Sequence, residues 1–214
     1  MARHKPRSAK AFRRRGPTRE PYDVVLIVCE GEKTEPEYLK GLQKFHRLSN
    51  ANITIVPGDG NDPVSIVKHA LEAYRRAGDD FNRVYCVFDR DGHANYQEAL
   101  DLVANSPLSR KGKLFAITSV PCFEIWVLLH FAYTTAAFVT AGGRSACDNV
   151  IGAIRGHAPE YQKALAGTFE QLEPRLDRAL THANRLAQHN RDTDSPNPAT
   201  KVHELVEYLR ELKK

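Results

Sequence analysis

The chain has 214 residues, of which 42% are hydrophobic and 27% charged, as in an ordinary soluble globular protein of one domain or of one domain with a helical appendage. No apolar run approaches the roughly 20 residues of a membrane span, and the N-terminus lacks the apolar segment of a signal peptide. Four scattered cysteines without a CxxC pair favour reduced thiols and a cytoplasmic protein. We therefore expect no membrane segment.

The net charge of +5 originates at the N-terminus. The first fifteen residues contain seven Lys and Arg and no acid, and setting them aside lowers the 31 Lys and Arg to 24, against 26 Asp and Glu. We predict a flexible basic leader over residues 1–20. It either keeps the protein soluble or binds nucleic-acid phosphates without sequence preference, chiefly through Arg13, Arg14 and Arg15.

The first half of the chain alternates strand and helix patterns. A consecutive apolar run predicts a strand over 22–29 that is buried on both faces. A helix should follow, with Thr34 and Glu37 as a capping box. The segment 52–58 predicts a second strand, before a helix that Asp62 caps.

The alternation continues with a strand over 83–88, a helix over 94–104, a strand over 113–120 and a helix over 122–131. Strands that alternate with helices favour a mostly parallel, Rossmann-like sheet flanked by helices, the α/β fold class. We assign this core to residues 21–135.

The pattern changes over residues 136–214, which contain no strand signal. Helices are expected around 146–155, 159–165, 170–189 and 199–213. We predict a C-terminal helical extension that packs on the core.

Acidic residues follow two of the predicted strands. Glu30 ends the first, and Asp89 and Asp91 end the third. The carboxyl ends of parallel strands lie at one edge of a sheet, so these side chains should converge there. Residues one apart point to the same side of an extended chain, and oxygen ligands suit Mg²⁺ or Mn²⁺. This pattern predicts a metal site for one or two ions.

Three further residues have two interpretations each. Glu35 is a metal ligand or an acid favoured by the dipole of its helix. Glu124 is an outer or further ligand of the metal, or it stabilises a helix N-terminus. His93 contacts a phosphate or is a surface-loop histidine. The spacings of an EF-hand, a P-loop and an HExxH zinc site are missing.

Four segments carry a resemblance to a known family: CEGEKTEPEYL, VFDRDGH, SVPCFEIWVLLHF and NPATKVHELVEYL. In this order they resemble the RloB-like family of bacterial phage-defence and restriction-associated operons. The first two also resemble the Toprim domain of type II topoisomerases, primases and OLD-type nucleases. The resemblance implies that Glu30 is a metal ligand and proton-transfer group, that Asp89 and Asp91 hold Mg²⁺, and that Glu35 is a second acid.

The resemblance further implies a Toprim-type, metal-dependent nuclease that hydrolyses DNA or RNA as the effector of an antiviral, abortive-infection system. Its partner would be an ATPase of the ABC or SMC type, and the helical extension could serve that contact or a homo-oligomer. The alternative is a non-catalytic subunit that binds metal and nucleotide and regulates such an ATPase. A solvent-open acidic cleft favours the nuclease, and a cleft sealed by the extension favours the regulator. A third hypothesis, a nucleotide-sugar transferase with a metal-binding DxD, leaves Glu30 without a role.

Overall fold

The computed structural model describes residues 23–50, 52–58, 60, 62–78, 80–90 and 92–212. None of the described helices has the length and apolar character needed to cross a membrane. Several predictions fall outside the described residues: the leader over 1–20, the arm residues Arg13, Arg14 and Arg15, and the metal ligand Asp91.

The chain forms one five-stranded sheet in the order β2-β1-β3-β4-β5. Its first four strands run parallel, and the short last one runs antiparallel to β4. The predicted class, a mostly parallel α/β sheet flanked by helices, is confirmed. The strands are β1 (Val25–Cys29), β2 (Ile53–Pro57), β3 (Arg83–Asp89), β4 (Leu114–Val120) and β5 (Ala199–Thr200).

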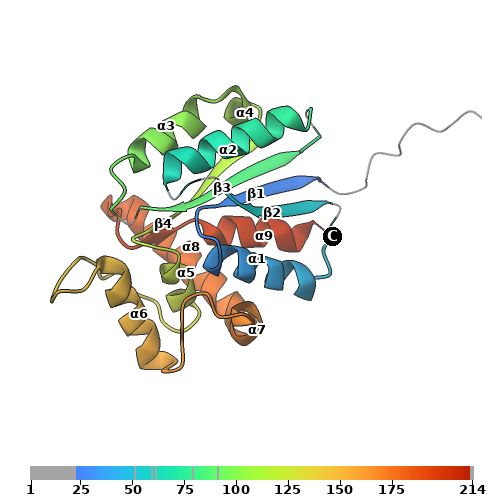
Figure 1. Ribbon diagram of the computed structural model, residues 1–214. Coiled ribbons are helices and arrows are strands. Elements are labelled where there is room, and N and C mark those ends of the chain that lie inside the picture. Colours follow the sequence, from blue (N-terminus) through green and yellow to red (C-terminus); the bar gives the residue numbers. More distant parts are fainter. Residues whose placement is uncertain are drawn as a thin grey trace, which may run out of the picture.

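Helices cover both faces of the sheet (Figure 1). One face carries α2 (Pro63–Arg76), α3 (Tyr96–Asn105) and α4 (Pro107–Arg110). The other carries α1 (Thr34–Phe45), α5 (Glu124–Leu129), α8 (Leu176–Thr193) and α9 (Val202–Glu211). The remaining helices are α6 (Ala146–His157), α7 (Thr168–Leu172) and the 3₁₀ turn η1 (Glu173–Arg175).

Alternate residues of each strand enter two separate hydrophobic cores. In β1, Val25 and Ile27 pack toward α1, α5, α8 and α9, whereas Leu26 and Val28 pack toward α2 and α3. This double burial is the reason that the apolar run is continuous. Helices of the segment 136–214 contribute to the first core, for example through Leu205 of α9. The boundary at residue 135 stays a prediction.

The prediction that residues 136–214 contain no strand is wrong. Ala199 and Thr200 form β5 and pair with Val120 and Ser119 at the end of β4. A strand of two residues shows no periodicity in the sequence, and it forms because β4 would otherwise present unpaired backbone groups at the sheet edge. The chain after α8 therefore returns to the sheet next to the carboxyl end of β4.

Two predicted helix starts have different outcomes. The capping box at Thr34 is wrong, because Thr34 is already helical and Lys33 precedes it without a side-chain hydrogen bond. The cap at Asp62 is confirmed: its Oδ1 accepts hydrogen bonds from the backbone N–H groups of Val64 and Ser65 at 3.1 and 3.2 Å. Pro63 is the first residue of this helix, a position at which proline is common.

Two predicted helices of the extension also differ from the structure. The segment 159–165 is not helical, and Ala164 has a φ of 60°, which an α-helix does not allow. The helix expected over 170–189 divides into α7, η1 and α8. Pro174 lies at the division, where proline removes a backbone donor and breaks a helix. The irregular chain between α6 and α7 is thereby free to approach the ends of the strands.

Candidate active site

Glu30 and Asp89 lie side by side because β1 and β3 are parallel neighbours, with Cys29 opposite Val87. The backbone N–H of Asp89 donates a hydrogen bond of 2.9 Å to Oε2 of Glu30. The N–H of Glu30 donates to the carbonyl of Val87, also at 2.9 Å. The structure therefore brings these two sequence-predicted residues together at the carboxyl edge of the sheet.

Their side chains follow opposite faces of the sheet. Asp89 continues the alternation of Val87, which packs toward α1 and α5, and Glu30 lies opposite Phe88, which packs toward α2 and α3. Oε1 of Glu30 is 2.8 Å from Nε2 of His93, and the His93 side chain is 30% exposed. His93 is therefore a loop residue, as one of its two interpretations expects, and its ring is paired with the carboxylate of Glu30.

Asp89 lines a pocket of about 370 Å³ that we call the acidic pocket. Glu35 enters it from the first turn of α1, Glu124 from the first residue of α5, and Lys163 from the loop between α6 and α7. Glu35 and Glu124 are only 7% and 1% exposed. Glu32 and Lys33 also line it, so elements far apart in the sequence bring four carboxylates and two ammonium groups into a single pocket.

Burial and mutual repulsion disfavour the ionised carboxylates. Burial raises the pKa of Glu35 to about 7, and the charges of Glu124 and Glu30 act in the same direction. Burial also raises the pKa of Asp89, with the Glu35 carboxylate as the next cause, against a hydrogen bond of 2.9 Å from the N–H of Phe123. A cation bound between them would favour the ionised forms and lower both pKa values.

Lys163 offsets part of the negative charge of the carboxylates. Its Nζ lies 3.2 Å from Oε1 of Glu124. Burial acts to lower the pKa of Lys163, but the neighbouring carboxylates, Glu124 foremost, outweigh it and raise the pKa. The ammonium group stays charged, and its side chain is 47% exposed. Sequence reasoning missed Lys163, because the pattern around it carries no signal of a site.

Gly31 gives Glu35 its position. A Cβ atom added to Gly31 would lie 2.2 Å from Oε2 of Glu35, well inside a van der Waals contact. The glycine after the first strand therefore leaves the volume that this carboxylate occupies.

The chain matches the RloB-like protein family over residues 25–209. It belongs to the RloB-like family. The resemblance of the four sequence segments is thereby confirmed. No curated protein and no solved structure matches the chain significantly.

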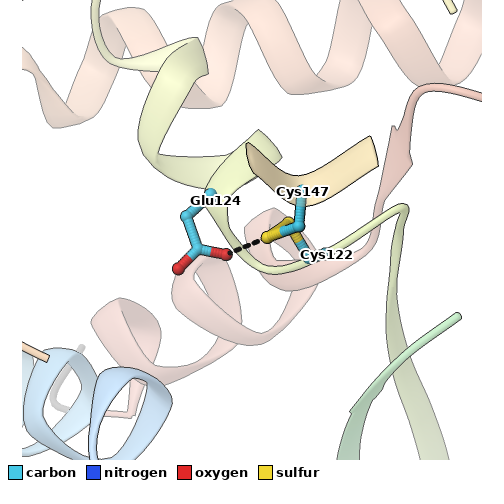
Figure 2. Close-up of side chains that lie close together, drawn as sticks. All are labelled: Cys122, Glu124 and Cys147. Carbon is cyan, nitrogen blue, oxygen red and sulfur yellow. Dashed lines mark hydrogen bonds between the residues drawn. A yellow bond between two sulfur atoms is a disulfide. The ribbon is translucent and has the colours of Figure 1, made fainter. Parts of the chain in front are cut away.

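Two cysteines of this RloB-like protein lie next to Glu124, which lines the acidic pocket. Cys122 and Cys147 form a disulfide, with Cα atoms 5.8 Å apart, and Sγ of Cys147 lies 3.2 Å from Oε2 of Glu124 (Figure 2). The expectation of reduced thiols is therefore wrong for this pair. It is confirmed for Cys29 and Cys86, which are buried free thiols. Spacing could not reveal a pair 25 residues apart, since the fold of α6 against α5 creates it.

Within the described residues of this RloB-like protein, one group of three has metal-ligating atoms within 4.8 Å of one another: Cys122, Glu124 and Cys147. The two sulfur atoms are bonded to each other, so in this state they are not thiolate ligands. Only the Glu124 carboxylate of this group is an anionic donor, and it also lines the acidic pocket. Glu124 therefore joins the disulfide to the predicted metal site.

Proposed function

We propose that this RloB-like protein is a metal-dependent nuclease that hydrolyses phosphodiester bonds of DNA or RNA at the acidic pocket. The observation that carries the proposal is the convergence of Glu35, Asp89 and Glu124, with Lys163, in one pocket at the carboxyl edge of the sheet. Ligand sites of open α/β sheets lie at this edge. Carboxylates next to an ammonium group form the kind of site that binds phosphate together with a divalent cation.

The chemistry of the donor set fits a hard cation. In this structure the ligand atoms of Glu35, Asp89 and Glu124 do not all lie within 4.8 Å of one another, so a bound ion would have to draw them together. Glu35, Asp89 and Glu124 would hold Mg²⁺ or Mn²⁺, since both prefer carboxylate oxygens and water. The raised pKa values of Glu35 and Asp89 support this assignment, because a cation relieves the repulsion that causes part of the increase. The metal would polarise the phosphate and lower the pKa of a bound water. We propose Asp91 as a further ligand from the sequence alone.

The other residues of the site would stabilise negative charge, hold the end of β3 in place and transfer protons. The Lys163 ammonium can donate to a phosphate oxygen, where it would stabilise the negative charge of the transition state. Glu30 accepts from the Asp89 N–H and so fixes the end of β3. A proton can pass between the Glu30 carboxylate and solvent through His93, which is partly exposed and 2.8 Å away.

The accessibility of the pocket favours the nuclease over the regulator. The extension contributes Lys163, and this side chain is about half exposed. Glu32 and Lys33, which also line the pocket, are exposed. A phosphate can therefore approach from solvent. Membership of the RloB-like family supports the wider proposal, an antiviral effector in the cytoplasm that works with an ABC or SMC-type ATPase.

The test is cleavage of labelled DNA and RNA, tRNA included, by the full chain with Mg²⁺, Mn²⁺ or a chelator, with and without the neighbouring ATPase. Asp89→Asn and Glu124→Gln remove ligand charge at nearly constant volume. Glu98→Gln is the matched control, since Glu98 is exposed on α3. We expect metal-dependent cleavage that both site variants abolish and the control retains.

A Lys163→Gln variant refines the test. Loss of one donor to the transition state should lower the turnover number about a hundredfold. Metal binding is measured in parallel by isothermal titration calorimetry. If every variant and condition leaves nucleic acid intact while wild type binds metal and Asp89→Asn does not, the protein is the regulatory subunit and the nuclease proposal is wrong.

A further inference from the structure

A second, larger pocket lies at the same edge of the sheet, on the α3 side. Its volume is about 740 Å³. The loop after β3 and the start of α3 form one wall, and the end of α8, β5 and the start of α9 form the other. We call it the edge pocket. Its volume lies within the range of small-molecule sites.

The edge pocket is cationic, in contrast to the acidic pocket. Arg90, Arg191 and Lys201 line it and are exposed, and His93 lies beside them. Among the described lining residues, Glu204 is the one acid. Guanidinium and ammonium groups on opposite walls of a pocket favour a ligand that carries phosphate.

Two of the lining residues also have a buried polar atom that lacks a partner within the described part of the chain. His203 is 3% exposed, and its Nδ1 has no hydrogen-bond partner within the described part of the chain. The same holds for Oδ1 of Asn190, although Nδ2 of Asn190 donates to the carbonyl of Pro198. Buried polar atoms are usually satisfied, and one that lines a pocket can be satisfied by a ligand. Burial lowers the pKa of His203 and so favours the neutral ring, against the charges of Glu204 and Glu207 and a hydrogen bond with the backbone of Thr200.

Hydrogen bonds connect the two pockets. His93 lines the edge pocket and pairs with Glu30. Glu30 accepts from the backbone N–H of Asp89, and Asp89 lines the acidic pocket. Two consecutive hydrogen bonds therefore lead from one pocket to the other across the end of β3. The two pockets therefore lie on either side of the end of β3 and are separated by these hydrogen-bonded groups.

We propose that the edge pocket binds one unpaired nucleotide of the substrate, adjacent to the phosphate at the acidic pocket, and that the substrate is single-stranded nucleic acid. This inference rests on the proposed nuclease function. Arg191 and Lys201 contact the phosphate of that nucleotide, and His203 and Asn190 hydrogen-bond its base or sugar. Tyr96, which also lines the pocket, offers a ring on which a base can stack. A base inside a duplex is paired and stacked, so it cannot enter a pocket of this kind.

The experiment measures binding without cleavage. Fluorescence anisotropy of the full chain is recorded with a labelled single-stranded DNA, the RNA of the same sequence and the DNA duplex, with a chelator present throughout. The variant Arg191→Gln/Lys201→Gln removes two charges from the edge pocket. Lys68→Gln/Arg178→Gln removes two exposed charges from α2 and α8 and is the matched control.

We expect the edge-pocket variant to weaken single-strand binding about tenfold and to lower the slope of log affinity against log salt by about 1 to 2, as loss of two phosphate contacts predicts. The control should bind like wild type. The duplex should bind more weakly than either single strand and should be insensitive to the edge-pocket variant. Equal affinities of the edge-pocket variant and the control would overturn the proposal, and a duplex that binds as tightly as the single strands would overturn its single-strand part.

A His203→Gln variant separates base recognition from general charge. It should weaken single-strand binding and leave the salt slope unchanged, because no phosphate contact is lost. Thermal melting confirms that each variant is folded. Binding that depends on the edge pocket, in a protein that cleaves nothing, would refute the nuclease and retain this site. If the protein cleaves nucleic acid but the edge-pocket variant binds it like wild type, the proposed nucleotide site is refuted and the nuclease proposal is not.

Discussion

The carboxylate of Glu30 accepts a hydrogen bond from the backbone N–H of Asp89 at 2.9 Å, and this bond joins the ends of two neighbouring strands. The other oxygen of Glu30 is 2.8 Å from His93. Both carboxylate oxygens therefore have protein partners, and the Glu30 side chain is 12% exposed. Glu30 lines neither pocket and instead positions the residues between them.

The first prediction concerns this positioning. Glu30→Ala leaves the Asp89 N–H without its acceptor and should lower the free energy of unfolding by about 1–3 kcal/mol. Glu30→Gln keeps an acceptor oxygen and should cost clearly less. Urea unfolding measures both, with the exposed Glu32→Ala as the control. Equal losses for Ala and Gln would show that the charge, and not the hydrogen bond, stabilises this edge.

The sequence predicted the strands well because their burial leaves a direct pattern. Consecutive apolar residues such as Val84 to Phe88 identify a strand covered on both faces, and the acids that follow identify its functional end. Side-chain direction was harder to foresee. Glu30 and Asp89 share an edge, but a strand alternates its faces at every residue, so their relative register decides where each carboxylate lies.

Other parts of the site have no recognisable pattern in the amino-acid sequence. Lys163 lies in an irregular segment, and its role depends on how the extension folds back on α5. The disulfide of Cys122 and Cys147 and the pairing of β5 with β4 also depend on contacts between distant segments. Sequence periodicity reports local structure, so contacts of this kind remain invisible to it. The edge pocket, which β5 helps to form, escaped prediction for the same reason.

The second prediction is that metal affinity increases with pH. The pKa of Glu35 is raised to about 7, and a carboxylate must lose its proton to bind metal. The apparent affinity for Mn²⁺ should therefore be about tenfold higher at pH 8 than at pH 6, as release of one proton near pH 7 requires. Titration calorimetry in buffers of different ionisation enthalpy counts the released proton. Glu35→Gln should bind more weakly and show a smaller pH dependence, of which Asp89 supplies the remainder. A wild-type affinity that does not change with pH would contradict the assignment.

The third prediction concerns acid stability. His130 is fully buried; its Nδ1–H donates to the Trp126 carbonyl at 2.9 Å, and the Tyr38 hydroxyl lies 3.4 Å from its Nε2. Burial lowers the pKa of His130 from 6.5 to about 4, so the folded state holds the neutral ring. Because the folded-state pKa is the lower one, the stability contribution is complete above pH 6.5 and is lost as the pH falls toward 4.

Chemical unfolding at pH 7 and pH 4.5 measures this loss, which should reach about 2–3 kcal/mol for this one group. His130→Gln cannot take up a proton, so its stability should change less between the two pH values. His157→Gln, at an exposed position of α6, is the control and should keep the wild-type dependence. Parallel pH profiles for wild type and His130→Gln would contradict the role of His130.

The fourth prediction concerns the disulfide. Cys122 and Cys147 enclose a loop with a sequence separation of 25, and opening such a loop should lower the free energy of unfolding by about 3 kcal/mol. Dithiothreitol should therefore destabilise the wild type and leave the Cys147→Ser variant unaffected. Thiol titration of the denatured, unreduced protein should count only Cys29 and Cys86. Four reactive thiols in that titration would show that the bond is absent.

The fifth prediction uses the contact between Gly31 and Glu35. The methyl group of Gly31→Ala would overlap Oε2 of Glu35, which is the far end of a flexible side chain and can move away. The protein should therefore fold with nearly unchanged stability while the carboxylate leaves its place in the acidic pocket. Calorimetry should show a metal affinity that is lower by about tenfold or more. Loss of the contacts that hold a metal ligand in place typically has an effect of this size, and displacing Glu35 should act in the same way.

Gly152→Ala is the matched control, since a Cβ at Gly152 in α6 meets no atom within 4 Å. It should leave metal affinity unchanged and raise stability slightly, because alanine favours a helix. A Gly31→Ala/Glu35→Gln double variant completes a cycle. If Gly31 acts through Glu35, the double variant should bind metal no more weakly than Glu35→Gln alone. Additive losses would show that the methyl group disturbs another part of the pocket, and Glu35 would then not be the ligand that Gly31 positions.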